Sequence, residues 1–580
     1  MRRTIPIPLH LLLGLALSVP AAATIAPAAF GATEENGVVV VTAEEIARMK
    51  ARKIADVLNH IPGVEAGDSS VGIHGSYKVK VLLDGRPLND PTSSYGAVNL
   101  SVVDPDQVER IEILRGKGGV RYGQDASGGV ILITSRAVRE ISASAKAYGG
   151  NLETGYGQAS VQGRSGRWTA EAGGEAETTQ GYTVNNDDVR HQGGVRLAYA
   201  VDDERSVQVS ADFIHEDQGL SGLPDFPTPH SRKTSETTVL AAQAKALGFT
   251  SATSFNSGEN HNTDVSKNLD QRLRVNELGE TLTSSFATGG FGTMEYGLGY
   301  RLAEASSDTF AGKSEETFSL FASQNLNRGT SPWTLTAGLR ANCNTAFDDA
   351  LNPEIKLAYQ REHWGATLSY SGSNNTPSFH QRYNRTSSTR PNPNLDMETA
   401  DNYSLAATYT PIERLSLRAS VFYNRLSDRI SYITGTDGVG QYENLGEVTY
   451  RGGDLAVNWR AADNLGIRAG YTYLKAVDEE TGLYVTAKSK HRATLDCSWQ
   501  ATENLMIVLS GKYVSKAYLY RDNSKSTPGY ALADMRAEYR LDRRWALFAE
   551  IDNLADTAYS YADGLLAPPL TWLAGMSWKL

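Results

Sequence analysis

From about residue 138 to residue 580, apolar and polar residues alternate in segments of some ten residues, each closed by turn residues. Residues 333–340 show the pattern, because their apolar side chains occupy every second position: Trp333, Leu335, Ala337 and Leu339. Strands with one apolar and one polar face are what a β-barrel in lipid with a wet lumen requires. A soluble β-sandwich or propeller alternates in the same way, so alternation alone leaves both architectures open.

The N-terminus favours an exported protein. Arg2 and Arg3 precede an apolar run at residues 9–19, and small residues follow at 21–23 and 29–31. We therefore predict a secretory signal peptide over residues 1–32, cleaved after residue 23 or residue 31. No later stretch of 18 apolar residues occurs. A membrane-inserted chain would then have to be a closed barrel, whose backbone groups pair with one another.

The last eight residues alternate like one more strand. They contain Gly575, then Trp578, and end on the apolar residue Leu580. Such a strand is expected to close a barrel by pairing with the first strand, which removes both open edges. The segment also partly resembles the C-terminal signal of outer-membrane barrels. The sequence contains 28 tyrosines, a residue that suits a water–lipid interface. These features favour a transmembrane barrel.

Residues 38–137 have a different sequence pattern, which is typical of a compact mixed α/β domain. Residues 43–58 have helical spacing, with Thr42 as the expected N-cap and Glu45 as its capping-box partner. The Pro62-Gly63 pair ends this helix. Short β-like runs follow at residues 79–85, 110–114 and 129–135.

Several function classes are disfavoured by what the sequence contains. The net charge of −10 argues against general nucleic-acid binding. No nucleophile elbow, zinc-protease motif or phosphate loop stands out, so we predict no enzyme, no catalytic residue and no metal site. Cys343 and Cys497 lie too far apart to be on neighbouring strands of an up-and-down barrel, and two free thiols in apolar settings are expected.

Three stretches, taken in order, resemble the plug domain of TonB-dependent receptors: ADVLNHIPGV (55–64), VKVLLDGRPLND (79–90) and VERIEILRGKGGVRYGQDASGGVILITS (108–135). Fainter similarities to the barrel of that family occur at 376–384, 392–405, 442–455 and 550–559. The resemblance implies a mainly β fold. An antiparallel transmembrane barrel of about 22 strands (138–580) would be occluded by the N-terminal plug (38–137).

The resemblance also implies a function and partners. The chain would be a monomer in the outer membrane of a Gram-negative bacterium, contacting lipid and lipopolysaccharide. It would import a scarce small molecule with energy delivered by TonB and its inner-membrane complex. A ferric siderophore is the favoured ligand and a corrinoid such as cobalamin is the alternative. A passive porin or adhesin is the rival from another class, but it would need no plug. No cofactor is implied, and whether calcium orders the loops stays open.

Energy transfer in this family requires an exposed segment, the Ton box, that pairs with TonB as an added strand. Within residues 33–42 the candidate is the β-branched run Val38, Val39, Val40, Val41 and Thr42, which suits strand addition. The same run lies where the first plug strand should be. Either it serves both roles, or a shorter Ton box lies at residues 33–36.

Polar contacts must hold the plug in the barrel and yet be breakable. The family often uses two plug arginines against barrel carboxylates. Arg115 matches one of them, but His74 stands at the other position, within Ile73-His74-Gly75. Histidine titrates near neutral pH, so this position predicts a weaker or pH-sensitive contact. Lys117 also replaces the proline usual after Arg-Gly.

Ligand contacts are expected from the plug apex and from the loops. The candidates are aromatic and basic: Tyr95 on the plug, Arg382, Tyr383, Arg385 and Arg390 in one loop, and Arg521 in another. Basic and aromatic side chains together suit an anionic, ring-bearing ligand such as a ferric catecholate. Such loops are also found on surfaces that face anionic lipopolysaccharide.

Overall fold

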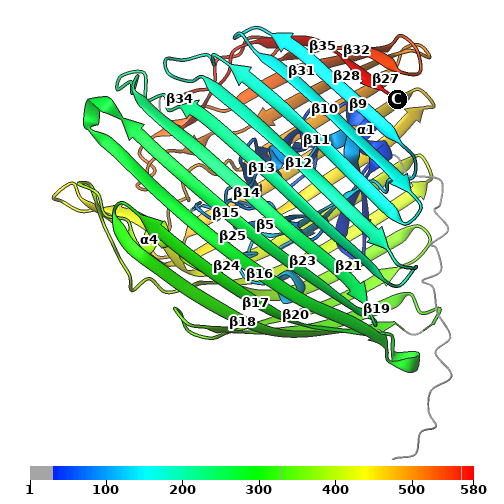
Figure 1. Ribbon diagram of the computed structural model, residues 1–580, viewed down its shortest axis with the longest axis horizontal. Helices are drawn as coiled ribbons and strands as arrows, with labels where there is room; N and C mark the ends of the chain where they lie inside the picture. The colour runs from blue at the N-terminus through cyan, green and yellow to red at the C-terminus, as the bar shows by residue number, and fades with distance from the viewer. Residues whose placement is uncertain (1–30, 94, 328, 563–564) are drawn as a thin grey trace, which may run out of the picture.

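The computed structural model describes residues 31–93, 95–327, 329–562 and 565–580. Within them 22 antiparallel strands form a closed barrel (Figure 1). These strands are β9 (Ser142–Gly150), β10 (Gly155–Ser165), β11 (Trp168–Thr179), β12 (Asp188–Ala200), β13 (Ser206–Gly219), β14 (Ser231–Ala246), β15 (Phe249–Asp264), β16 (Leu269–Ala287), β17 (Thr293–Ser307), β18 (Phe310–Asn327), β19 (Trp333–Asn344), β20 (Ala350–Gln360), β21 (Trp364–Asn375), β23 (Glu398–Ile412), β24 (Leu415–Thr434), β25 (Gly440–Ala462), β26 (Leu465–Asp478), β27 (His491–Gln500), β28 (Leu505–Val514), β31 (Tyr530–Arg540), β32 (Trp545–Asp552) and β35 (Thr571–Lys579). The predicted barrel and its approximate strand number are confirmed.

The barrel closes as the C-terminal sequence predicts. Strand β35 pairs antiparallel with β9, with Leu573 opposite Gly150 and Lys579 opposite Ser144. Pairing of the last strand with the first satisfies the backbone groups of both, so neither is left as an open edge.

The alternating pattern marks the outer face correctly. Trp333 and Leu339 are 51% and 45% exposed on the outside of β19, whereas Arg340 beside them is 8% exposed. Both cysteines are unpaired, and both follow the phase of the outward residues, as expected. The apolar side chains face outward and the polar side chains line the interior, which is the arrangement that a barrel in lipid requires.

The N-terminal domain, called the plug below, lies inside the barrel, where Figure 1 shows it in blue. Its six-stranded sheet has the order β1-β2-β7-β8-β5-β6. The strands are β1 (Thr33–Glu35), β2 (Val38–Thr42), β7 (Val108–Arg115), β8 (Gly129–Ser135), β5 (Val79–Leu83) and β6 (Arg86–Pro87), and a hairpin of β3 (Val64–Gly67) and β4 (Ser70–Ile73) lies beside them. Short helical turns η1 (Leu100–Val102), η2 (Pro105–Gln107) and α3 (Gly119–Tyr122) complete the plug.

The single helix predicted over residues 43–58 is two helices, α1 (Ala43–Met49) and α2 (Ile54–Asn59). Lys50 adopts the left-handed conformation that ends α1, and the Asp56 carboxylate accepts hydrogen bonds from the backbone of Arg52 and Lys53 at the start of α2. Thr42 caps α1 as predicted. No helix in the described part of the chain is both long and apolar enough to cross a membrane.

The two ends of the barrel differ. Short turns and the C-terminus lie at one end, here the turn end, on the right in Figure 1. Longer connections at residues 180–187, 220–230, 376–397, 479–490, 515–529 and 553–570 lie at the other, the loop end, which includes α4 (Phe379–Tyr383). The remaining short elements are η3 (Val265–Lys267), η4 (Gly289–Phe291), β22 (Thr389–Arg390), β29 (Ala517–Tyr518), β30 (Ser526–Thr527), β33 (Ser560–Ala562) and β34 (Leu565–Leu566).

Candidate functional site between the plug, the barrel wall and the loops

A tight turn carries His74 from the plug to the barrel wall. His74 and Gly75 both have positive φ, 49° and 89°, and Ile73 and Ser76 pair across them. This geometry points the imidazole at strand β25, where its Nε2 lies 2.8 Å from Oδ2 of Asp454. The ring also stacks on Phe422 of β24, with centroids 3.6 Å apart. The ion contact and the ring contact together fix the side chain.

Arg115, the last residue of β7, reaches the same carboxylate. Its Nη1 donates to Oδ2 of Asp454 at 3.0 Å, and Asp454 is 4% exposed. The structure therefore places His74 and Arg115, the two predicted plug contacts, on one barrel residue. One buried barrel carboxylate therefore serves two plug side chains, and its removal would leave both without this partner.

Glu34 also joins this contact, although it was not among the predicted plug residues. Its Oε2 accepts from Nη2 of Arg115 at 3.1 Å and lies 3.6 Å from Nε of Arg418 on β24. Glu34 lies on β1, at the N-terminal edge of the plug sheet. The ion network thus links the first described strand of the chain to the plug–barrel contact.

Glu45 is a second carboxylate whose role was wrongly predicted. Its side chain does not complete a capping box at Thr42. It accepts from Gly31 N at 2.9 Å and forms an ion pair with Arg468 of β26. Glu45 is 2% exposed. A cationic partner could have been predicted, because Glu45 lies beside Ile46 on the apolar side of a helix and a buried carboxylate needs such a partner.

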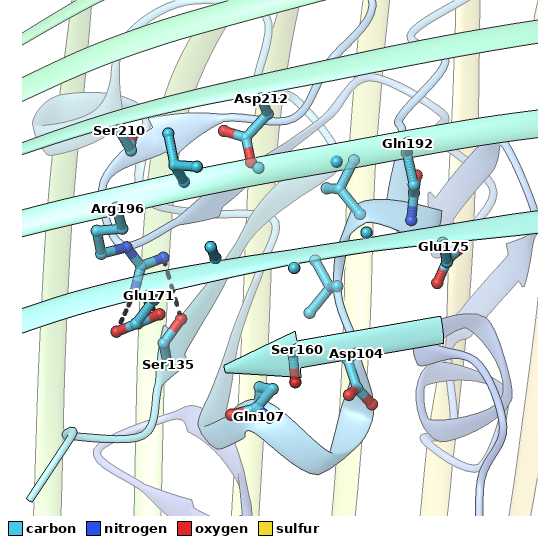
Figure 2. Close-up of a pocket in the computed structure, with 18 of the residues that line it drawn as sticks. Asp104, Gln107, Ser135, Ser160, Glu171, Glu175, Gln192, Arg196, Ser210 and Asp212 are labelled. Atoms are coloured by element: carbon cyan, nitrogen blue, oxygen red, sulfur yellow. Dashed lines mark hydrogen bonds and ion pairs between the residues drawn. The ribbon is translucent and has the colours of Figure 1, made fainter. Parts of the chain in front are cut away.

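On the opposite side of the plug, a polar crevice of about 170 Å³ separates residues 101–108 from strands β10 to β13 (Figure 2). Arg196 of β12 crosses this gap, with Nη2 2.8 Å from Oδ2 of Asp84 in the plug and Nη1 3.3 Å from Glu171 of β11. Ion pairs and solvent-sized space at this contact make it breakable.

Lys117 gives the plug a pH dependence that can be measured. Lys117 is 5% exposed, and its burial, only partly offset by Glu34, lowers its pKa to about 8. The unfolded chain keeps this proton up to pH ~10.4, so stability should rise between pH 8 and 10. We expect a gain of at most about 3 kcal/mol in the free energy of plug unfolding. Thermal unfolding of the wild type and Lys117→Met over this pH range tests the expectation.

Lys117→Met should abolish the rise in stability between pH 8 and 10 and should stabilise the plug at pH 7. Lys53→Met is the matched control, because Lys53 is half-buried but paired with two carboxylates, Asp68 at 3.1 Å and Glu177 at 3.8 Å. This variant should keep the rise. An unchanged pH profile in Lys117→Met would contradict the assignment.

An aromatic group surrounds the plug apex at the loop end. Tyr95 is 64% exposed, and its hydroxyl lies 3.1 Å from that of Tyr442 on β25. Tyr442 packs in turn against Tyr432, at 5.1 Å between centroids, and against His380 of α4, at 6.2 Å. Of these residues only Tyr95 was predicted as a ligand contact.

Lys488, in the connection 479–490, lies over the second exposed tyrosine of the apex. Its Nζ is 3.7 Å from the ring centre of Tyr77. In the described part of the chain no acceptor lies within hydrogen-bonding distance of this buried nitrogen. Burial lowers the pKa of Lys488 to about 8 and raises that of Tyr77 to about 12. At neutral pH the pair is therefore a cation on a neutral phenol.

The predicted loop residues have different surroundings. Arg382 is 2% exposed, forms an ion pair with Glu315 and packs on Phe347, so it belongs to the loop's own packing. Tyr383 packs against it, with its hydroxyl 3.2 Å from the guanidinium. Arg385 is exposed.

The other two basic candidates form ion pairs between connections. Arg390 is paired with Asp437 at 2.5 Å, and Arg521 lies 3.4 Å from Asp478. Neither joins the tyrosine group at the plug apex in any described contact.

The valine run of the proposed Ton box is an internal strand. Strand β2 pairs with β1 on one side and β7 on the other, and Val39 and Val41 are fully buried. Strand β1 is the edge of the sheet. The predicted signal peptide, residues 1–32, lies almost wholly outside the described residues.

Over the described ranges, no group of three or more His, Cys, Asp or Glu side chains is arranged to hold a metal ion.

Two family models match the chain. A model described as "TonB dependent receptor-like, beta-barrel" matches residues 142–554, and one described as "TonB-dependent Receptor Plug Domain" matches residues 33–130. The two matches fall on the two structural parts described above.

The names of the curated relatives refer to two kinds of ligand. The chain is 24% identical over 552 residues to a vitamin B12 transporter of Photobacterium profundum, covering 90% of this chain and 88% of the relative. It is also 24% identical over 668 residues to a ferric enterobactin receptor of Pseudomonas aeruginosa, with the same coverage of 90% and 88%.

Solved structures have the same fold. A ferric enterobactin receptor mutant from Pseudomonas aeruginosa superimposes with a TM-score of 0.77 at 19% identity, covering 94% of this chain and 100% of that one. An iron transporter of Neisseria meningitidis superimposes with a TM-score of 0.78 at 15% identity, covering 94% and 99%.

Proposed function

The chain belongs to the TonB-dependent receptor family, whose barrel model matches most of it, and on this premise we propose that it imports a ferric siderophore of the anionic catecholate type. The loop end then faces the medium and the turn end the periplasm. TonB supplies the energy from the periplasmic side. The ligand is held at the plug apex until the plug yields a path.

The observation that carries the proposal is the Lys488–Tyr77 contact. A buried ammonium with no acceptor among the described residues lies 3.7 Å from the ring centre of Tyr77, a residue that is 37% exposed. A ferric tris-catecholate is a trianion made of flat aromatic rings, and both of its properties match this contact. The tyrosine group around Tyr95 and Tyr442 adds ring surface beside it.

Corrinoid import is the second candidate, because curated relatives include vitamin B12 transporters. Cobalamin carries no net charge, and a buried, unpaired lysine offers it little. The charge at Lys488 is the feature that separates the two proposals.

Calorimetric titration of the refolded protein with ferric catecholate and with cyanocobalamin tests the ligand class. Wild-type protein should bind the catecholate, and Lys488→Met should weaken that binding by roughly tenfold or more, because ~1.4 kcal/mol changes affinity tenfold. The ammonium–ring contact and the charge attraction are both lost in this variant.

Lys490→Met is the matched control. Lys490 lies in the same connection and 3.8 Å from the ring centre of Tyr484, a residue of that connection and not of the plug. This variant should bind like the wild type. Binding of cyanocobalamin alone, or equal affinity of both variants for the catecholate, would contradict the proposal.

A further inference from the structure

Two internal cavities lie end to end beside the plug. The larger, about 600 Å³, is bounded toward the loop end by Leu152, Tyr182 and Pro568. The smaller, about 270 Å³, is bounded toward the turn end by Asp542, Arg543 and Arg544 of the β31–β32 turn. Together they extend along the same stretch of barrel wall, strands β31 and β32, from one end of the barrel to the other.

The two cavities share three lining residues: Arg52, Arg536 and Glu550. Arg52 belongs to the link between α1 and α2 of the plug, whereas Arg536 and Glu550 belong to the barrel. The guanidinium of Arg536 lies 3.2 Å from Glu550 and 3.3 Å from Asp56 of α2, and Arg52 Nε lies 3.7 Å from Glu550. These four side chains, the ion cluster below, separate the cavities.

The ion cluster is well fastened on the plug side. The Asp56 carboxylate also accepts from the backbone of Arg52 at 3.2 Å, and Arg52 Nη1 donates to the Tyr148 hydroxyl at 2.9 Å. Burial alone would raise the pKa of Asp56, but Arg536 and Arg52 lower it to about 2. The carboxylate therefore stays charged at every pH the cell meets, and the cluster does not open by titration.

The cavities on either side have opposite charge. Among the described residues, carboxylates outnumber lysines and arginines eight to four around the larger cavity. Lysines and arginines outnumber carboxylates nine to four around the smaller one. An acidic section repels anions and a basic section repels cations, so ions of either sign meet one unfavourable section.

We propose that the ion cluster is the gate of a passage beside the plug, and that the passage, once open, admits small uncharged hydrophilic solutes. Opening would require movement of these side chains, because three of the four line both cavities. This activity does not depend on the identity of the imported ligand, nor on TonB.

Swelling of liposomes that contain the purified, full-length protein tests the gate, with arabinose as the neutral solute. The gate variant is Arg536→Ser with Glu550→Ser, which removes both barrel side chains without leaving a net charge. It should admit arabinose at least tenfold faster than the wild type. Potassium conductance in planar bilayers should stay far below that of an unplugged barrel.

The control breaks a different plug–barrel ion pair. Arg121 and Glu295 lie 3.1 Å apart and line neither cavity. The variant Arg121→Ser with Glu295→Ser should swell no faster than the wild type. Heat-modifiable gel migration verifies that each barrel is folded.

Three outcomes would overturn the proposal. A folded gate variant that admits no arabinose would mean that other groups close the passage. Equal swelling of the control would mean that any lost ion pair loosens the plug. A conductance as large as that of an empty barrel would mean that the plug has left.

Discussion

Asp454→Asn is expected to weaken the docking of the plug by about 3–5 kcal/mol, the range found when one partner of a buried ion pair is removed. Oδ2 of this carboxylate lies 2.8 Å from His74 and 3.0 Å from Arg115. Without its charge, Arg115 and Arg418 remain buried with Glu34 as their one described carboxylate partner. Limited proteolysis of the plug and its thermal unfolding measure the effect.

Glu112→Gln is the control for this substitution. Glu112 lies 2.9 Å from Arg110, and the side chain of that arginine is 48% exposed. Exposed pairs contribute about 0–1 kcal/mol, so this variant should be protected from protease like the wild type. If Asp454→Asn leaves protection and unfolding unchanged, the ion network does not hold the plug.

Proline substitution at Thr33 or Glu35, in the segment Thr33–Asn36, is expected to lower ligand uptake at least tenfold and to leave ligand affinity unchanged. Glu34 and Asn36 are left intact, because Glu34 belongs to the plug–barrel ion network and Asn36 has a φ of 50° that proline cannot adopt. We propose that this segment, and not the valine run, pairs with TonB. Strand addition needs an open edge, and β1 is the sheet edge whereas β2 is paired on both sides. Proline removes the backbone donor that an added strand would use.

The comparison with strand β2 separates recognition from folding. Val40→Pro should unfold the plug, because it breaks pairing in the interior of the sheet. Uptake and binding would then fall together. Normal uptake by both the Thr33→Pro and the Glu35→Pro variants would place the TonB contact elsewhere in the chain.

The position of Glu34 ties these two predictions together. This residue lies on β1, and its carboxylate lies 3.1 Å from Arg115. A partner that draws β1 away from the sheet also withdraws the counter-charge of Arg115 and Arg418. In that case the losses of plug docking free energy caused by Asp454→Asn and by the removal of β1 should not be additive, since both act on one network.

Much of the architecture was predictable from local patterns. The two-residue period assigned the lipid face of β19, and the same reasoning paired β35 with β9. Turn residues and three plug motifs placed the N-terminal domain. These features depend on neighbours in sequence, and a strand in lipid tolerates very few alternatives to an apolar outer face.

Where local signals competed, the prediction was wrong. The helical period of residues 43–58 concealed a break at Lys50, because a left-handed residue and the capping carboxylate of Asp56 interrupt a pattern that is otherwise continuous. Glu45 fitted a capping box, yet Arg468 takes its side chain. In both cases a distant or side-chain partner outweighed the propensity of the local segment.

Local patterns in the sequence were sufficient to predict the strand faces, the closure of the barrel and the presence of a plug. Which groups these charges meet depends on the tertiary structure: His74 and Arg115 meet Asp454, Arg52 meets Glu550, Arg536 meets Asp56, and Lys488 meets Tyr77. These partners are hundreds of residues apart, and their meeting depends on how the plug is turned inside the barrel. A buried charge needs a partner, but which residue comes within a few ångströms of it depends on the fold.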